Sequence, residues 1–248
     1  MSSSTRAASG AIHRDGGTAG GRLGRTVSGA AIAVGCVLFL GGFAWTAVAY
    51  RPYVVPTQSM RDTVNPGDRV LARHVSGAAV HRGDVVVFQD KLWGDQPLVK
   101  RVVGVGGDVV ACCDRLGRLT VDGRPVDERY LRGGGPASAE KFSATVPKGE
   151  LFLLGDNRSV SEDSRVHIED AQQGAVPVGD VKARVEATVW PLGRAGMLPR
   201  TSAFDTLPGA GGQSPPGPLE WLFFAVIAGA ALILGGAVYG PLVRMARR

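Results

Sequence analysis

The sequence is poor in the residues from which most metal, cofactor and nucleic-acid sites are built. Aromatic residues make up 6% of its 248 residues, and it holds three cysteines and four histidines. It has no CxxC or HExxH motif and no clustered carboxylates, and the glycines at 104, 106 and 107 lack the spacing of a dinucleotide-binding loop. We therefore expect no metal and no cofactor.

The middle of the chain has no net charge. The net charge of +6 comes from four arginines against one aspartate before residue 27 and from three arginines after residue 220. A DNA or RNA groove would need basic and aromatic residues gathered on the folded domain. We therefore do not expect a nucleic-acid partner.

Two long runs carry no charge at all, residues 26–50 and 221–243. Each exceeds the ~20 residues that cross a bilayer as a helix, and each has Trp or Tyr near its ends. The sequence Ala47-Val48-Ala49 also suits a cleavable signal sequence, but the first run is longer than the ~7 to 15 residues of a signal core. With arginines flanking both runs, the positive-inside rule predicts a plasma-membrane protein with both termini cytoplasmic and residues 51–220 outside.

The external region is predicted to be mainly β. Short strands rich in valine or leucine follow turn-forming Gly, Asp and Pro residues, and no long helical period competes with them. The predicted strands are 69–72, 84–88, 98–103, 108–112, 119–121, 151–154 and 183–190. We expect the Pro- and Gly-rich residues 191–218 to form a flexible path back to the second span, and residues 1–25 to be disordered.

A serine and a lysine in the external region could form a catalytic pair. Ser59 lies just beyond the first uncharged run, in YVVPTQSM, and a serine nucleophile needs a base to remove its proton. None of the histidines, at positions 13, 74, 81 and 167, has a triad-like setting. Lys100 interrupts an apolar run, and desolvation there could lower its pKa enough for it to act as the base. On residue types alone, an exposed lysine and a serine in a polar turn would be the commoner arrangement.

Four motifs in fixed order favour the catalytic pair: PTQSM around Ser59, GDVVVF, KRVVGVGGD from Lys100, and GDNRSVSEDSR from Gly155. Over about residues 27–192 the chain resembles the bacterial type I signal peptidases, in an actinobacterial-like form with two membrane spans. The last motif matches the family pattern GDNRxxSxDSR at every fixed position. The resemblance implies a serine endopeptidase with an antiparallel β-sheet catalytic domain, a small β insertion domain and two transmembrane helices.

The resemblance also implies a role for individual residues. Ser59 would be the nucleophile, Lys100 the general base, and Ser161 the group that orients the lysine amine. Thr57 would help the Ser59 backbone N–H to form the oxyanion hole. The supporting ion pairs would be Arg101 with Asp156 and Asp163 with Arg165, although ordinary surface pairing is an equally common explanation for each pair taken singly. The family usually has proline three residues after the nucleophile, whereas this sequence has Asp62.

By the same resemblance the partners are exported preproteins, cleaved after an Ala-x-Ala-like site, and the lipid bilayer. Shallow pockets that select small side chains would be lined by apolar residues, which are Val55, Pro56, Met60, Val64 and Val99. The predicted external domain has a catalytic core of residues 51–106 and 148–192, an insertion domain of residues 107–147 and a linker of residues 193–220. The predicted membrane spans are residues 26–50 and 221–243, and the predicted cytoplasmic tails are residues 1–25 and 244–248.

Some alternatives stay open at this point. Cys112 and Cys113 are adjacent and could form a disulfide of unusual geometry or remain reduced. Another serine/lysine protease of related fold, such as a self-cleaving or maturation protease, and a catalytically idle membrane-bound binding domain are the competing functions. The oligomeric state, the preproteins that are cleaved and the role of the insertion are not predicted.

Overall fold

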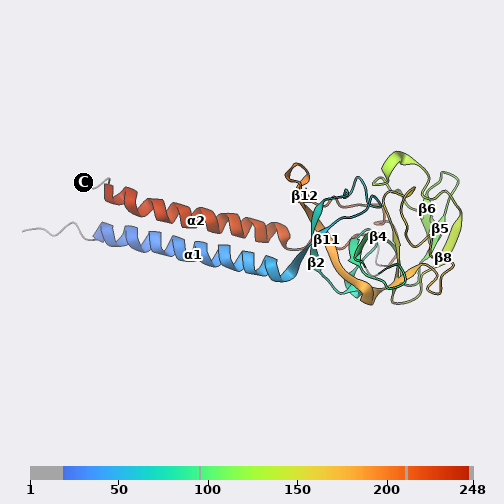
Figure 1. The fold of residues 1–248 in the computed structure, drawn as a ribbon. Coiled ribbons are helices and arrows are strands. Elements are labelled where there is room, and N and C mark those ends of the chain that lie inside the picture. Colours follow the sequence, from blue (N-terminus) through green and yellow to red (C-terminus); the bar gives the residue numbers. More distant parts are fainter. Residues whose placement is uncertain (1–18, 95, 210–211, 246–248) are drawn as a thin grey trace, which may run out of the picture. The chain divides into compact units, whose positions relative to one another are not determined.

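The chain divides into two compact units (Figure 1). The computed structural model describes residues 19–245, except 95, 210 and 211. One unit comprises Met1–Trp45 with Glu220–Arg248, and the other is Thr46–Leu219. Most of the tail predicted at residues 1–25, and residues 246–248 of the C-terminal tail, lie outside the described residues.

The first unit contains two helices, α1 (Ala19–Ala49) and α2 (Leu219–Met245). Within them, Gly24–Ala49 and Leu219–Tyr239 are long and apolar enough to cross a membrane. The predicted spans at 26–50 and 221–243 coincide with these helices. The first helix begins earlier than predicted, at Ala19.

Small residues bring the two helices into close contact. A methyl group added to Gly35 would lie 2.8 Å from the Gly229 carbonyl oxygen, and one added to Gly42 would lie 3.0 Å from a Val226 methyl. The Ser28 hydroxyl donates a hydrogen bond of 2.6 Å to the carbonyl oxygen of Gly236. Small residues and hydroxyl hydrogen bonds of this kind are typical of helix contacts inside membranes.

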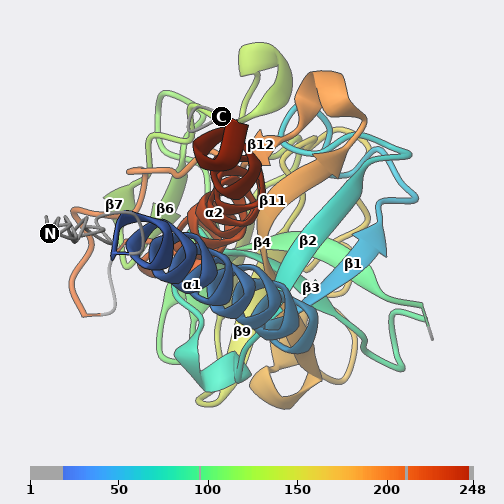
Figure 2. The same ribbon diagram turned by 90° about the vertical axis from the view of Figure 1, so that its left-hand side faces the viewer.

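The second unit is built on two antiparallel sheets, so the predicted fold class is confirmed. The larger sheet has the strand order β1-β2-β11-β3-β4-β9-β10, with β12 paired to β11 (Figure 2). Its strands are β1 (Tyr50–Val54), β2 (Arg69–His74), β3 (Val85–Phe88), β4 (Leu98–Val105), β9 (Glu150–Leu154), β10 (Ala175–Pro177), β11 (Val181–Trp190) and β12 (Gly196–Met197). Strands β3 and β4, in the middle of the sheet, are buried and rich in valine, which sheet interiors favour.

The smaller sheet has the order β7-β6-β5-β8. Its strands are β5 (Val109–Cys112), β6 (Leu119–Val121), β7 (Arg124–Pro125) and β8 (Phe142–Thr145). Cys112 and Cys113, at the end of β5, form a disulfide with each other. Short 3₁₀ helices connect strands in both sheets: η1 (Gly77–Ala79), η2 (Arg132–Gly134), η3 (Val178–Asp180) and η4 (Leu192–Arg194).

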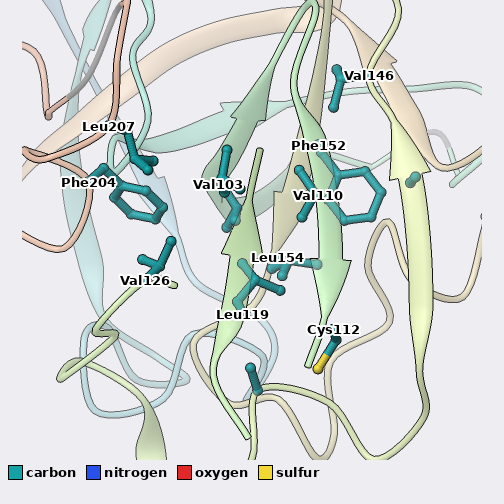
Figure 3. Packing of buried hydrophobic residues seen from close by; sticks show 13 residues of the cluster. Val103, Val110, Cys112, Leu119, Val126, Val146, Phe152, Leu154, Phe204 and Leu207 are labelled. Carbon is teal, nitrogen blue, oxygen red and sulfur yellow. The ribbon is translucent and has the colours of Figure 1, made fainter. Parts of the chain in front are cut away.

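The largest buried cluster joins the two sheets (Figure 3). Val103 of β4 and Phe152 and Leu154 of β9 pack against Val110 of β5 and Leu119 of β6. These side chains are 0% exposed. A second cluster lies beneath the loop that carries Ser59, and a third lies among β3, β4, β9 and β11.

The segment after β11 is packed, which differs from the predicted flexible path. Phe204 and Leu207 enter the cluster between the sheets, where Figure 3 shows them near Val126. Ser214 is buried, and its hydroxyl donates to Asp84 at 2.5 Å. The prediction weighed the prolines and glycines of this segment, but Leu198, Phe204, Leu207 and Ser214 are all buried and attach it to the β-rich unit at several points.

We expect Phe204→Ala to lower the free energy of unfolding of the β-rich unit by about 3 to 5 kcal/mol, because it leaves a cavity between the sheets. Leu192→Ala, at a side chain 75% exposed in the same region, should change it by less than about 0.5 kcal/mol. Urea unfolding in detergent, followed by tryptophan fluorescence, measures both. Equal effects of the two substitutions would show that the segment is not part of the packed core.

Candidate active site

Ser59 lies in a tight loop between β1 and β2. The loop is closed at its base by hydrogen bonds of 2.9 Å from the Val55 N–H to the Asp68 carbonyl and from the Gly67 N–H to the Val55 carbonyl. Met60 and Val64 are fully buried in the apolar cluster beneath it. These contacts hold Ser59 in place, and its side chain is only 6% exposed.

The two backbone groups of Ser59 differ in their hydrogen bonding. Its carbonyl oxygen accepts the Asn157 N–H at 2.9 Å, whereas its own N–H makes no hydrogen bond within the described residues. Its Oγ lies 3.0 Å from Thr57 Oγ1, and either hydroxyl can be the donor. The backbone N–H is therefore left as a donor beside the serine hydroxyl.

Lys100 lies in the middle of β4, paired with Val86 of β3, and is 3% exposed. Burial lowers the pKa of its amine to about 8, although the carboxylates of Asp163 and Glu162 act in the opposite direction. In the described part of the chain its amine makes no hydrogen bond or ion pair, and hence none to Ser59. The arginines buried in that part all pair with carboxylates: Arg82 with Asp108, Arg101 with Asp156, and Arg184 with Glu186.

Gly155 brings the predicted residues together. The antiparallel register pairs Arg101 with Leu154, so Gly155, one residue further along, lies opposite Lys100. A methyl group on Gly155 would overlap both Ser161 Oγ and the Ser59 carbonyl oxygen. The position therefore requires glycine, because the Ser59 loop and the Ser161 loop approach the backbone there from two sides.

Ser161 is buried beside this glycine. No described group makes a hydrogen bond of good geometry with its hydroxyl, which contributes only weakly to lowering the pKa of Asp163. Burying a hydroxyl without a partner costs about 1 to 3 kcal/mol. Such a group is suited to accept a partner that moves toward it.

Two ion pairs fix the loop that carries Ser161. Arg101 binds both carboxylate oxygens of Asp156, at 2.9 and 2.6 Å, and both side chains are 1% exposed. Arg165 binds Asp163 at 2.8 Å, and the Gly155 N–H donates to the same carboxylate at 3.0 Å. Burial alone would raise the pKa of Asp163, but the hydrogen bonds and charge of Arg165 outweigh it and lower this pKa.

The residues predicted to line substrate pockets divide into two groups. Val55, Met60, Val64 and Val99 belong to one buried cluster, and Pro56 is exposed. Met60 and Val64 are 0% exposed, so core packing accounts for both in this structure. The pocket assignment of these residues stays a prediction.

Three residues at the site were not singled out from the sequence. Asn157 donates to the Ser59 and Gln58 carbonyl oxygens, and Thr63 donates to Asp156 at 2.5 Å. Gly155 and Asn157 both lie in the GDNR motif, so the motif itself was a signal for them. Nothing local distinguishes Thr63, whose partner is 93 residues away.

The chain is similar to a known protein family and to individual members of it. Residues 25–190 match the family model described as "Signal peptidase, peptidase S26". The chain belongs to this family. Signal peptidase I of Mycobacterium tuberculosis (strain CDC 1551 / Oshkosh) is 32% identical over 199 residues, which is 60% of this chain and 67% of that protein. The chain is therefore a serine endopeptidase of the signal peptidase I type, as its motifs predicted.

Two further proteins similar to the chain are also signal peptidases. Signal peptidase I U of Bacillus subtilis (strain 168) is 32% identical over 132 residues, covering 50% of this chain and 69% of that one. The crystal structure of a signal peptidase I from Enterococcus faecalis V583 aligns with a TM-score of 0.34 at 28% identity, over 42% of this chain and 93% of the other.

The turn after the nucleophile differs from the one that a proline would make. Asp62 of this signal peptidase has a φ of +81°, whereas proline is fixed near −65°. Its N–H also donates to Asn65 Oδ1 at 3.3 Å, a bond that proline cannot make. Aspartate tolerates the left-handed region better than most residues do, so this departure from the family pattern has a local physical reason.

We expect Asp62→Pro to lower the free energy of unfolding by more than about 1 kcal/mol, because the substitution excludes the native φ and removes the donor. Asp62→Gly should leave stability equal or higher, since glycine adopts positive φ without strain. Thermal unfolding of the three proteins in one detergent compares them. If the proline variant proved as stable as the glycine variant, the turn described above would be wrong.

Proposed function

We propose that this signal peptidase is a membrane-embedded enzyme that uses a Ser59/Lys100 dyad to remove signal peptides from exported preproteins after an Ala-x-Ala-like site. The observation that carries the proposal is the buried, unpaired amine of Lys100. Its strand lies opposite Gly155, and Gly155 contacts both the Ser59 loop and the Ser161 loop. A lysine in such a setting is neutral often enough to serve as a base near neutral pH.

In the proposed reaction, Ser59 Oγ forms a bond to the scissile carbonyl carbon while its proton moves to Lys100 Nζ. The C–N bond then breaks, and Lys100 returns the proton to the leaving amine. A water molecule attacks the acyl-enzyme, with Lys100 taking its proton and passing it to Ser59 Oγ as the ester bond breaks. The hydrogen bond between the dyad atoms would form when substrate is bound, since such bonds are often loose in free enzymes.

Thr57 and Ser59 are proposed to form the oxyanion hole. The free N–H of Ser59 supports this role, because it is a buried donor that no described backbone group uses. Thr57 Oγ1, 3.0 Å from Ser59 Oγ in this structure, would turn its proton toward the developing oxyanion. Removing one such donor can cost about 3 kcal/mol of transition-state stabilisation.

Ser161 is proposed to orient the lysine amine, and the Arg101–Asp156 and Asp163–Arg165 pairs to fix its loop. The support is the buried Ser161 hydroxyl without a good partner, on a loop held at both Asp156 and Asp163. An orienting acceptor keeps the amine lone pair directed at the nucleophile, which reduces the entropy lost in the transition state.

The substrate is proposed to bind as an extended segment beside residues 53–56 and the Lys100 strand. Strand β1 is at the edge of the larger sheet and pairs only with β2 among the described strands, which supports the part of this proposal that concerns residues 53–56. In the strand order, β2, β11 and β3 lie between β1 and the Lys100 strand. We retain Val55, Pro56, Met60, Val64 and Val99 as the proposed pocket residues, of which Pro56 is the most exposed.

The membrane arrangement is also part of the proposal. The two apolar helices would span the plasma membrane, with the arginines beyond them placing both termini in the cytoplasm. Residues 51–106 and 148–192 would form the catalytic core on the extracytoplasmic face, with 107–147 as its insertion. Ser59, a few residues after α1, would then act close to the outer surface.

We expect Ser59→Ala and Lys100→Met each to lower kcat by about a thousandfold or more, because each removes one half of a unit that acts together. Ser143→Ala and Lys148→Met, at exposed positions of the same domain, are the matched controls and should retain full activity. Cleavage of a preprotein with an Ala-x-Ala site, assayed in detergent, measures all four. Retained cleavage by Ser59→Ala would refute the dyad.

We also expect kcat/KM to fall about tenfold for each pH unit below about 8. Lys100 must be unprotonated to act, and its pKa of about 8 means that acid converts it to the inactive ammonium form. A series of rates from pH 6 to 10, with circular dichroism to confirm folding, gives the profile. A rate that is flat from pH 6 to 9 would exclude this lysine as the base.

A further inference from the structure

Part of the connection between β7 and β8 of the smaller sheet contacts the loop that carries Ser161. Residues 127–132, called here the 127–132 segment, follow β7 and lead into η2. The segment begins next to Val126, which is 1% exposed in the cluster between the sheets and whose N–H bonds to the Leu119 carbonyl. Its inner side chains reach residues 155–158, the first four residues of the GDNR motif.

Glu128 makes the first contact, with Arg158. Both carboxylate oxygens of Glu128 bind the Arg158 guanidinium, one at 2.5 Å and one at 3.0 Å, and the two side chains are 2% and 7% exposed. Arg158 Nε in turn donates to the Gly155 carbonyl oxygen at 3.1 Å, and its Nη1 donates to the Ala137 carbonyl oxygen. Glu128 is thus linked through Arg158 to Gly155, which lies between the Ser59 loop and the Ser161 loop.

Tyr130 makes the second contact, with Arg101. The Arg101 guanidinium carbon lies 4.0 Å from the centre of the Tyr130 ring, and the Tyr130 hydroxyl donates to Glu128 at 2.5 Å. The ring therefore covers one face of the Arg101 guanidinium, which binds Asp156. The Arg132 N–H also donates to the Asp156 carbonyl oxygen at 3.3 Å.

We propose that Glu128 and Tyr130 are positioning residues of the catalytic centre, holding Gly155 and Asp156 where Ser161 and the Lys100 strand require them. The smaller sheet is then part of the active-site scaffold, not an accessory module. The proposal rests on the dyad mechanism above and extends it to residues that touch neither substrate nor reacting atoms.

Burial distinguishes this arrangement from an ordinary surface ion pair. Removing one partner of a buried pair leaves the other as an unpaired charge, which the structure relieves by moving or by admitting water. Water beside Gly155 would reach the Lys100 amine, whose environment also contains the charges of Asp163, Glu162, Arg165 and Asp156. Loss of Glu128 should therefore change the ionisation of Lys100 as well as the rate.

The first experiment compares steady-state kinetics of Glu128→Gln with those of Glu140→Gln. Glu140 is exposed in the same connection between β7 and β8, so the control removes the same charge without touching the loop. We expect Glu128→Gln to lower kcat about tenfold with KM changed less than about twofold, because a small displacement of the catalytic groups slows the reaction without weakening substrate binding. The acid limb of its pH profile should move to higher pH, and Glu140→Gln should match the unmodified enzyme in all three measurements.

Tyr130 offers a second pair of variants with little risk to folding. Tyr130→Phe keeps the ring over Arg101 and loses only the hydroxyl, so its kcat should fall less than about threefold. Tyr130→Leu keeps an apolar side chain but removes the ring, and should lower kcat about tenfold. Equal kcat values for the two variants would overturn the role of the ring.

A measurement independent of catalysis decides the inference separately. Trace labelling of the amine with acetic anhydride over a pH series, read by mass spectrometry, gives the ionisation midpoint of Lys100 itself. We expect this midpoint to rise in Glu128→Gln and to stay unchanged in Glu140→Gln. An unchanged midpoint and pH profile in Glu128→Gln would overturn the inference while leaving the dyad intact, whereas an active Ser59→Ala enzyme would overturn the dyad.

Discussion

The burial of the Lys100 amine without an acidic partner is the constraint on which the site depends. Lowering the pKa of this lysine from 10.5 to about 8 corresponds to about 3 kcal/mol against its charged form. An arginine in the same strand position would stay charged and would need a carboxylate, as Arg101, the next residue, does. The sheet can hold the unpaired amine because both neighbouring strands present valine and leucine, and because two of the nearby carboxylates, Asp156 and Asp163, are paired with arginines.

The pairing of those other charges follows from the same constraint. Asp163 lies close enough to raise the pKa of Lys100, and a free carboxylate there would keep the lysine protonated. Arg165 binds Asp163, and Arg101 binds Asp156, so these two carboxylates each have their own cation. The ion pairs therefore fix the loop geometry and also reduce the negative potential at the amine.

The sequence predicted the parts of this arrangement that depend on local patterns. All seven strands predicted from valine-rich runs and turn residues correspond to β2–β6, β9 and β11, whereas β1, with its proline, and the two- to four-residue strands β7, β8, β10 and β12 gave no clear alternation. The composition of residues 191–218 suggested flexibility because Phe204 and Leu207 are few among many prolines and glycines. Glu128 and Tyr130 could not be found, since their partners are about 30 residues away and an acidic, aromatic turn usually faces solvent.

The beginning and the end of the β-rich unit meet at a single buried carboxylate. The Tyr50 hydroxyl donates to Glu186 at 2.8 Å, Arg73 and Arg184 bind the same carboxylate, and Gly217 packs against it with no room for a side chain. Burial, together with Glu186, raises the pKa of Tyr50 well above its usual range, so the tyrosine stays a donor. Because β1 runs from Tyr50 directly into the Ser59 loop, the position of the nucleophile depends on this carboxylate at one end and on Gly155 at the other. The loop of residues 155–165 contacts the Ser59 loop through Asn157, and it is held by the ion pairs of Asp156 and Asp163 and by the contact of Glu128 with Arg158.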